Sequence, residues 1–243
     1  MPTSTDIDIK LYTYSLSIKH DPQLVEPTIE MSEAMTDVAY DISANRIYIS
    51  QAQPPSKIFG IRAFDRSLSG TITLTLPATT AHGKIKLGSG GLVSEIDFSD
   101  ISVKLGAGNI QLPSLTNAEI KTGAGDIHIA QGEHIAVKTG CGNITVDQLH
   151  SQQSSDCKTG VGRINVGHLH GSLNASSIEL KSGSGNILVG IVPETAIYLD
   201  LQSGLGEVNS DLSEASQPLE TSQRVKLEVK TGIGRIDVQR SQG

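Results

Sequence analysis

The stretch Lys138-Thr139-Gly140-Cys141-Gly142-Asn143-Ile144 decides the fold of this chain, because related phrases recur along most of its length. A lysine, a threonine, Gly-x-Gly, a polar residue and Ile stand in the same order at 121–127, 158–164 and 230–236. More divergent copies contain the Gly pairs that begin at Gly88, Gly106, Gly183 and Gly204. Successive copies lie 17 to 28 residues apart. Such a period is typical of a solenoid, whose units bury their apolar faces by stacking on one another.

Apolar and polar residues alternate on both sides of each Gly pair. In one unit Ile135 and Val137 precede the pair, and Ile144 and Val146 follow it. Alternation with a period of two over such short segments predicts β-strands. Each unit is therefore expected to be a strand, a Gly-x-Gly corner and a second strand, since glycine adopts the positive φ of a sharp reversal without steric penalty. The predicted corner residues are Gly88, Gly90, Gly106, Gly108, Gly123, Gly125, Gly140, Gly142, Gly160, Gly162, Gly183, Gly185, Gly204, Gly206, Gly232 and Gly234.

These patterns predict an all-β fold, a parallel β-helix or β-roll solenoid with a strand-rich N-terminal segment that caps it. Residues 1–80 form the capping block in this interpretation, and residues 81–243 form the Gly-x-Gly repeats; the two can also be one continuous domain. The first segment contains alternating runs at 7–11, 46–50, 57–61 and 71–76. A short helical turn is one interpretation of the stretch between them, 31–40.

The aromatic residues predict a different core in the first quarter of the chain. Six of the eight Phe and Tyr residues fall there, namely Tyr12, Tyr14, Tyr40, Tyr48, Phe59 and Phe64. We therefore expect bulky aromatic packing in that segment, and packing by Ile, Val, Leu and Ala in the repeats.

A lysine stands two residues before the first glycine of most units. Stacking in register about 4.8 Å apart aligns these lysines into an outward column. Its members are Lys86, Lys104, Lys121, Lys138, Lys158, Lys181 and Lys230, of which the last six form the candidate interaction face. Acidic residues two positions earlier form a second column that relieves the repulsion, namely Glu119, Asp156, Glu179, Asp200 and Glu228. The columns can be a docking surface for a charged partner or a solvated face with weak ion pairs.

Composition excludes several function classes. The net charge of −7 over 243 residues repels polyanions, so we expect no nucleic-acid binding. The N-terminus shows neither a secretory signal nor a spanning helix, which favours a cytoplasmic location, with no direct membrane insertion and envelope association only through a partner. Cys141 and Cys157 lie at different phases of the repeat, so we expect no disulfide.

Metal and phosphate sites find little support in the residues. His150 and His170 occupy the same phase of neighbouring units and, with His168, could hold a metal ion or simply be surface histidines. Two arginines, Arg163 and Arg235, stand where a repeated calcium site needs an acid. The glycine-rich stretch at 88–91 is not followed by Gly-Lys-Ser/Thr. We assign no metal and no cofactor.

Catalytic residues are not assigned either. Glu95, Asp97 and Asp100 lie close together and could flank a glycosidic bond, but the repeats offer no aromatic platform for a sugar. The longest interval between units, Ser210–Gln223, reads as an exposed loop that shields the last coils from edge pairing or carries partner contacts.

The motifs resemble those of a known family. Leu74-Thr75-Leu76-Pro77-Ala78-Thr79-Thr80, followed by tandem Lys-Thr-Gly-x-Gly-Asp/Asn-Ile units, is similar to the bacterial "putative adhesin" β-strand-repeat family, a domain of unknown function. The resemblance extends from the N-terminal strands through Val238. It implies a right-handed β-helix or roll without known catalysis, and it offers no functional residues to transfer.

The function expected from the sequence is a non-enzymatic β-repeat scaffold or protein-interaction module. Its partner would be a protein, and the unpaired backbone of a terminal coil predicts self-association through the solenoid ends. An envelope-associated adhesin is the alternative, and a β-helix hydrolase acting on glycans is a further one.

Overall fold

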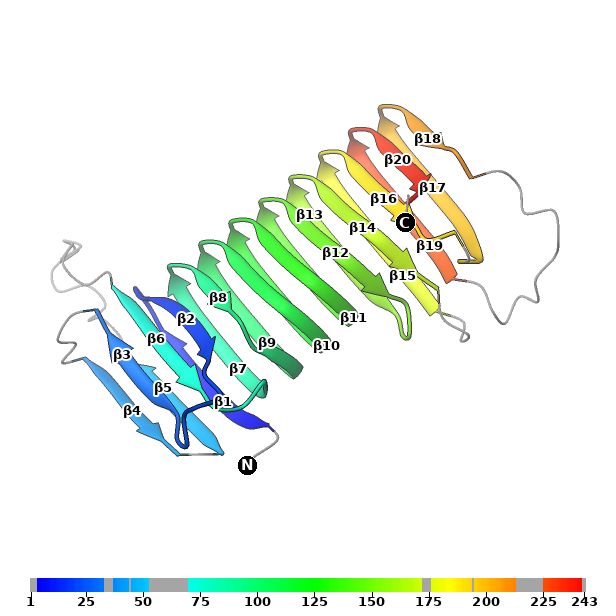
Figure 1. The fold of residues 1–243 in the computed structure, drawn as a ribbon. Coiled ribbons are helices and arrows are strands. Elements are labelled where there is room, and N and C mark those ends of the chain that lie inside the picture. Colours follow the sequence, from blue (N-terminus) through cyan, green and yellow to red (C-terminus); the bar gives the residue numbers. More distant parts are fainter. Residues whose placement is uncertain are drawn as a thin grey trace, which may run out of the picture.

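The chain folds into a stack of β-coils. The computed structural model describes residues 4–32, 37–43, 45–52, 70–171, 176–193, 195–212 and 225–241. Within them the chain forms 20 strands and no helix, and all the strands belong to one mostly parallel sheet. The sheet winds into coils that follow one another along a single axis (Figure 1). The all-β fold predicted from the alternation is therefore confirmed.

The strands have the following bounds. They are β1 (Thr5–Leu11), β2 (Ser15–His20), β3 (Thr28–Met31), β4 (Val38–Ile42), β5 (Arg46–Gln51), β6 (Thr71–Leu76), β7 (Thr80–Ser89), β8 (Leu92–Ser94), β9 (Asp97–Ala107), β10 (Ile110–Ala124), β11 (Ile127–Cys141), β12 (Ile144–His150), β13 (Ser155–Val161), β14 (Ile164–His170), β15 (Ser176–Ser184), β16 (Ile187–Ile191), β17 (Ile197–Leu205), β18 (Val208–Ser210), β19 (Val225–Ile233) and β20 (Ile236–Arg240).

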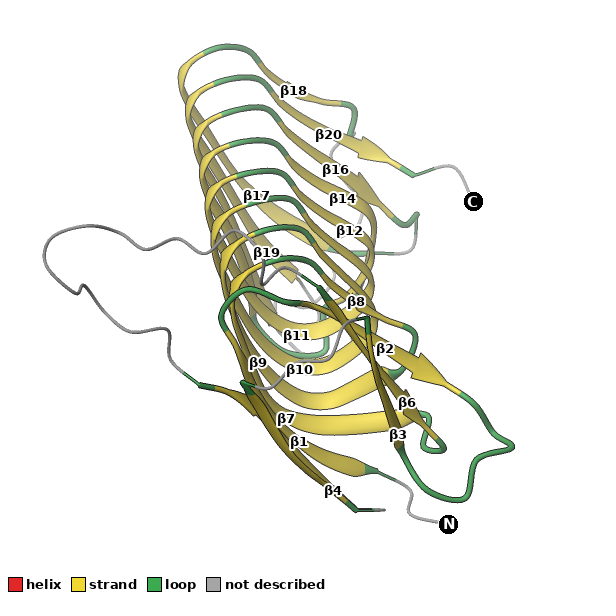
Figure 2. Cartoon of the chain, turned by 90° about the vertical axis from the view of Figure 1, so that its left-hand side faces the viewer, coloured by secondary structure: helices red, strands yellow, loops and turns green. Residues whose placement is uncertain are grey.

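Each coil has two faces joined by the Gly-x-Gly corner. We call the strands before the corners face A, for example β13 and β15, and the strands after them face B, for example β12 and β14. β10 and β11 are long because each continues from face B of one coil into face A of the next. The corners of successive coils lie in one row (Figure 2).

Parallel pairing in register aligns like residues into columns. Val137 of β11 pairs with Ile120 on one side and with Cys157 on the other. On face B, Ile144 pairs with Ile127 and Ile164 in the same way. These inward residues are at most 1% exposed, so each column is a continuous strip of the core. Burying an aliphatic side chain stabilises the fold by about 1.5–3 kcal/mol, and here the neighbouring coils provide that burial.

The order of the coils in space differs from their order in the chain at the C-terminal end. β19 pairs with β15 on one side and with β17 on the other, and β20 likewise lies between β16 and β18. The coil β17–β18 is therefore outermost, and the chain returns to insert its last coil inside it (Figure 1). Ser210 ends β18, and 213–224, most of the predicted loop, lies outside the described residues.

The N-terminal end repeats this arrangement. β1 lies between β5 and β7, and β2 lies between β6 and β8. The first coil of the chain is thus internal, and β5 and β6 lie outside it. Beyond them, β4 pairs antiparallel with β5 and β3 pairs antiparallel with β6. Ile9 of β1 pairs with Ile85 of β7, so the same columns continue through the first segment into the repeats.

The expectation of an aromatic core in the first quarter of the chain is wrong for the residues that the structure describes. Within the described residues its core is aliphatic, with residues such as Ile7 and Ile47, and among the tyrosines only Tyr14 is fully buried. Tyr40 and Tyr48 are exposed because they point outward from their strands, whereas Phe59 and Phe64 lie outside the described residues. In the segment 31–40, Met31 ends β3 and Val38 begins β4, where pairing with β6 and β5 satisfies their backbone groups, whereas 33–36, on which the expected helical turn depends, lie outside the described residues.

Candidate functional site

The two glycines of each corner are needed for different reasons. Gly142 has a φ of 147°, which L side chains rarely adopt. Gly140 has no positive φ, but a Cβ there would lie 2.5 Å from the carbonyl oxygen of Gly123 in the next coil. The first glycine therefore permits the close approach of stacked backbones, whereas the second permits both the turn and a close approach, since a Cβ at Gly142 would lie 2.1 Å from the carbonyl oxygen of Gly125. All 16 predicted corner glycines lie at the junction of faces A and B.

The polar residues of the repeated phrase bond from coil to coil. Thr159 donates from its hydroxyl to the carbonyl of Gly142, 2.9 Å away, and Ser182 does the same to Gly162. On the other side of the corner, the side-chain oxygen of Asn143 accepts a bond of 2.9 Å from the backbone N–H of Arg163. These bonds satisfy polar groups that a sharp corner would otherwise leave unpaired. The hydroxyl residue before the corner and the asparagine after it therefore both satisfy backbone groups of neighbouring coils.

The candidate lysine face is one straight ladder. Lys104 pairs with Lys121, which pairs with Lys138, and the series continues through Lys158 and Lys181 to Lys230. Because every rung is held by the parallel ladder, the lysine Cα positions repeat at about 4.8 Å along a rigid surface.

Sequence reasoning missed one member of this ladder. Lys10 pairs with Lys86, which pairs with Lys104. Its coil has Tyr12-Thr13-Tyr14 in place of Gly-x-Gly, so the repeated phrase does not reveal it. The alternation of Ile7, Ile9 and Leu11 around it was the available signal. The ladder is therefore Lys10, Lys86, Lys104, Lys121, Lys138, Lys158, Lys181 and Lys230, which we call the lysine ladder.

Acidic side chains neutralise the C-terminal half of the ladder. Glu179 bonds to Lys158 and Lys181, and these ammonium groups lower the pKa of its carboxyl. Glu228 lies 2.8 Å from Lys230 and 3.6 Å from Lys181, and its pKa is lowered mainly by Lys230. The predicted relief of repulsion is therefore present here, but in the N-terminal half the corresponding column contains few acids.

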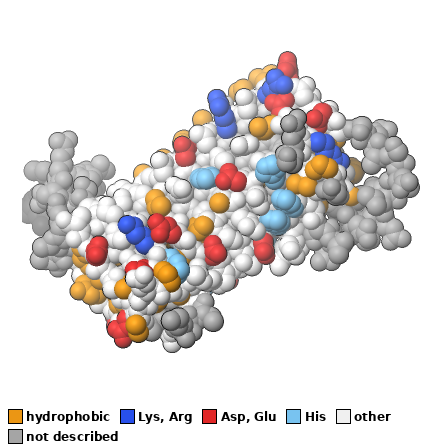
Figure 3. All heavy atoms as spheres, in the orientation of Figure 1, with side chains coloured by type: hydrophobic (Ala, Val, Ile, Leu, Met, Phe, Trp, Pro, Cys, Tyr) orange, Lys and Arg blue, Asp and Glu red, His pale blue; other side chains and the backbone are white. Residues whose placement is uncertain are grey.

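The histidines predicted to share a phase are in contact. His150 of β12 pairs with His170 of β14, and their rings stack with centroids 4.4 Å apart. Histidine side chains gather on this part of face B (Figure 3). Burial lowers the pKa of His170, and His150 and His168 lower it further. Among the described residues no group of three or more His, Cys, Asp or Glu side chains is placed to hold a metal ion.

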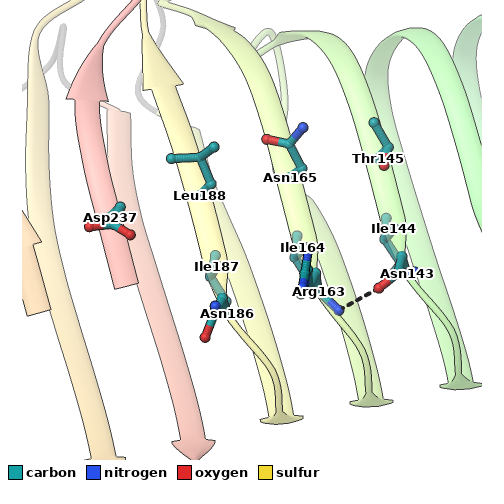
Figure 4. Close-up of a pocket in the computed structure, with 10 residues that line it drawn as sticks. All are labelled: Asn143, Ile144, Thr145, Arg163, Ile164, Asn165, Asn186, Ile187, Leu188 and Asp237. Atoms are coloured by element: carbon teal, nitrogen blue, oxygen red, sulfur yellow. Dashed lines mark hydrogen bonds between the residues drawn. The ribbon is translucent and has the colours of Figure 1, made fainter. Parts of the chain in front are cut away.

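A hollow of about 520 Å³ lies on face B beside the corners (Figure 4). Its walls come from four adjacent coils and include Thr145, Asn165, Leu188 and Asp237. The side chains of Asn143, Arg163 and Asn186 stand at the corner end, where Asn143 bonds to Arg163. The lining is a mixture of amide, hydroxyl, aliphatic and charged groups.

The other candidates are held by neighbouring coils. The Asp97 carboxylate accepts from the backbone N–H of Ser114, and that of Asp100 accepts from the Asn117 amide, so both tie one coil to the next. Both cysteines are free thiols. Cys141 is exposed, and burial raises the pKa of Cys157, in the core, to about 12.

The described part of the chain contains no helix with the length and hydrophobicity that crossing a bilayer requires. A model of the family described as Toastrack DUF4097 matches residues 5–243. Two solved structures are similar over most of the chain. One is a "putative cell adhesion protein" from Clostridium sporogenes ATCC 15579, with 11% identity, a TM-score of 0.27, and coverage of 98% of this chain and 93% of that one. The other is a "putative adhesin" from Bacteroides fragilis NCTC 9343, with 12% identity, a TM-score of 0.41, and coverage of 97% and 91%. No curated protein matches the chain.

Proposed function

The chain belongs to the Toastrack DUF4097 family, and from this premise and the geometry above we propose that it is a non-enzymatic β-repeat scaffold that binds a protein partner along face A. The observation that supports this proposal is the lysine ladder. Like side chains stand on consecutive rungs of one rigid sheet, as in the linear surfaces with which solenoid proteins bind partners. The partner would contact several coils at once.

The surroundings of the candidate carboxylates favour a scaffold over a hydrolase. Asp97 and Asp100 each accept a hydrogen bond from the adjacent coil, so both carboxylates already serve contacts between coils. The hollow on face B, in turn, holds a single carboxylate, that of Asp237, among the residues that line it. Retaining and inverting glycosidases both use a pair of carboxyl groups.

Self-association through the C-terminal end is a second part of the proposal. Within the described residues β17 pairs only with β19, and β18 only with β20, so both present an open edge. Leu205 and Val208 at this end are 69% and 43% exposed. At the other end the antiparallel strands β3 and β4 cover the outermost coil, and we propose that they act as its cap.

Partner capture from the native host tests the scaffold proposal. The test variant is Lys104→Gln/Lys121→Gln/Lys138→Gln, which removes three charges from the ladder. A control with the same loss of charge, Lys19→Gln/Arg46→Gln/Arg163→Gln, changes exposed residues outside it. We expect a protein that is retained by the wild type and the control and lost from the ladder variant, as measured by quantitative mass spectrometry.

Two outcomes would contradict the scaffold proposal. Equal capture of the partner by all three proteins would show that the ladder lysines do not contribute to partner binding. If the wild type hydrolyses a glycan substrate and Asp97→Asn abolishes this activity, the protein is an enzyme and the scaffold proposal is wrong.

A further inference from the structure

The two halves of the lysine ladder differ in their neighbours. In the described part of the chain, ion pairs within 4.0 Å engage all four lysines from Lys138 to Lys230, but none engages Lys86 or Lys104. The column beside them, where the other half has acids, holds Lys84 and Ser102. Asp8 stands in this column beside Lys10, and Glu119 pairs with Lys121, but Lys84, Lys86 and Lys104 leave this half with excess positive charge on a protein whose net charge is −7.

The same lysines line a groove. Lys10, Lys86, Lys104 and Lys121 form one side of a shallow hollow of about 500 Å³ on face A. Gly88, Gly106 and Gly123 also line it, and their backbones stack so closely on the neighbouring coils that a Cβ at any of them would meet a carbonyl oxygen. Tyr12 closes one end, with the Lys10 ammonium 5.4 Å from its ring centre. The lining is mostly apolar, because it consists of glycine, leucine and the aliphatic stems of the lysines.

From this charge and shape we propose that the groove binds an acidic segment of a polypeptide in an extended conformation, which lies along the solenoid axis. The proposal names the partner chemistry of the scaffold function and rests on that function. The four lysine Cα positions span about 14 Å, at about 4.8 Å per rung. Alternate residues of an extended peptide face the same side, and three of them span about 13 Å. Three carboxylates can therefore face the four lysine positions, of which Lys121 already pairs with Glu119.

Glutamate side chains suit both parts of the groove. Their methylene groups cover the apolar lining, and their carboxylates form charge-assisted hydrogen bonds with the rim. Nucleic acid suits it less well, since its affinity comes from many phosphate contacts and the rest of this acidic protein repels it. The acidic peptide is accordingly the occupant that charge complementarity favours.

Peptide binding measured by fluorescence anisotropy tests the inference. The probe is a labelled peptide of alternating glutamate and threonine with four glutamates, and its control has glutamine in place of every glutamate. The groove variant is Lys86→Gln/Lys104→Gln. The matched control is Lys19→Gln/Arg46→Gln, which removes the same charge from exposed positions outside the ladder. Thermal melting confirms that both variants are folded.

We expect the wild type to bind the glutamate peptide at low ionic strength and not the glutamine peptide. The groove variant should bind at least tenfold more weakly, and the control variant should stay within twofold of the wild type. No binding by the wild type, equal losses in both variants, or tighter binding of a double-stranded DNA oligonucleotide than of the peptide would overturn the inference. If the wild type does not bind the peptide but capture of the host partner still depends on the ladder lysines, the groove inference is wrong and the proposed scaffold function is retained.

Discussion

At the scale of single residues, each position of the repeated phrase has its own task. In one copy, Lys158 is outward, Thr159 bonds to the adjacent coil, Gly160 allows close stacking and Gly162 supplies the positive φ. Sequence reasoning identified the glycines but gave both the same cause. The second cause, the close approach of carbonyl oxygens from the neighbouring coil, depends on a contact between residues far apart in the chain.

The close approach at the first glycine predicts the effect of a single methyl group. Gly140→Ala places Cβ 2.5 Å from a backbone oxygen that cannot move without shifting its own coil. We expect a loss of about 1–3 kcal/mol in the free energy of unfolding, the range for local backbone strain. That corresponds to a fall of roughly 2–4 °C in Tm per kcal/mol, as measured by calorimetry.

Gly91→Ala is the control for this substitution. A Cβ at Gly91 meets its nearest contact, the Asn109 carbonyl oxygen, at 3.7 Å, and Gly91 has no positive φ. Its Tm should therefore stay close to that of the wild type. Equal effects of the two substitutions would contradict the account of close stacking.

At the scale of elements, the position of a coil in the stack decides how much its side chains contribute. Leu199 of β17 and Leu227 of β19 occupy the same phase and pair with each other. Leu227 is fully buried, because β15 and β17 flank its strand, whereas Leu199 is only partly buried at the end of the stack. If the coils followed chain order, Leu199 would be the internal residue and Leu227 the terminal one.

This matched pair of leucines predicts an asymmetry. We expect Leu227→Ala to lower the free energy of unfolding by about 2–5 kcal/mol, as for a fully buried leucine. Leu199→Ala should have less than half that effect, because the Leu199 side chain is only partly buried. Chemical denaturation of both variants measures the difference, and a larger effect at Leu199 would show that the coils stack in chain order.

At the scale of the whole molecule, both ends of the chain lie one coil inside the stack. β1 is covered by β5, and β19 is covered by β17, so fraying of either terminus is opposed by pairing on both sides. Within the described residues the two ends differ in kind: β3 and β4, which are antiparallel to the coil they cover and pair on one side only, form one end, and the parallel strands β17 and β18 form the other. This asymmetry predicts where self-association occurs.

The open end predicts a dimer that a charge can disrupt. Leu205→Lys/Val208→Lys adds two cations to exposed positions there, and Val25→Lys/Tyr40→Lys adds two to exposed positions near the opposite end. Light scattering over a wide concentration range should show a dimer for the wild type and the second variant and a monomer for the first. If the wild type stays monomeric at the highest concentration, the proposal of self-association through β17 and β18 is wrong.

The interaction surface shows how far a sequence reaches and where it stops. The register of Lys104 through Lys230 was predictable, because each lysine holds a fixed distance from a Gly pair. Lys10 was not predictable, because its corner is Tyr12-Thr13-Tyr14. The groove was not predictable either, because glycines and lysines of several coils form it together.

By itself, the sequence determined the strands, the corners and the columns of the repeats, since period-two alternation and glycine sterics act over a few neighbouring residues; the strand expected at 57–61 lies outside the described residues. Only the tertiary structure decided which coil lies beside which. The coil β19–β20 carries the same phase of apolar residues as its neighbours, so its ladder can pair with any of them. Local patterns therefore cannot specify the order. It is set by the packing of the complete stack, which places both chain ends inside and leaves β17 and β18 at the edge.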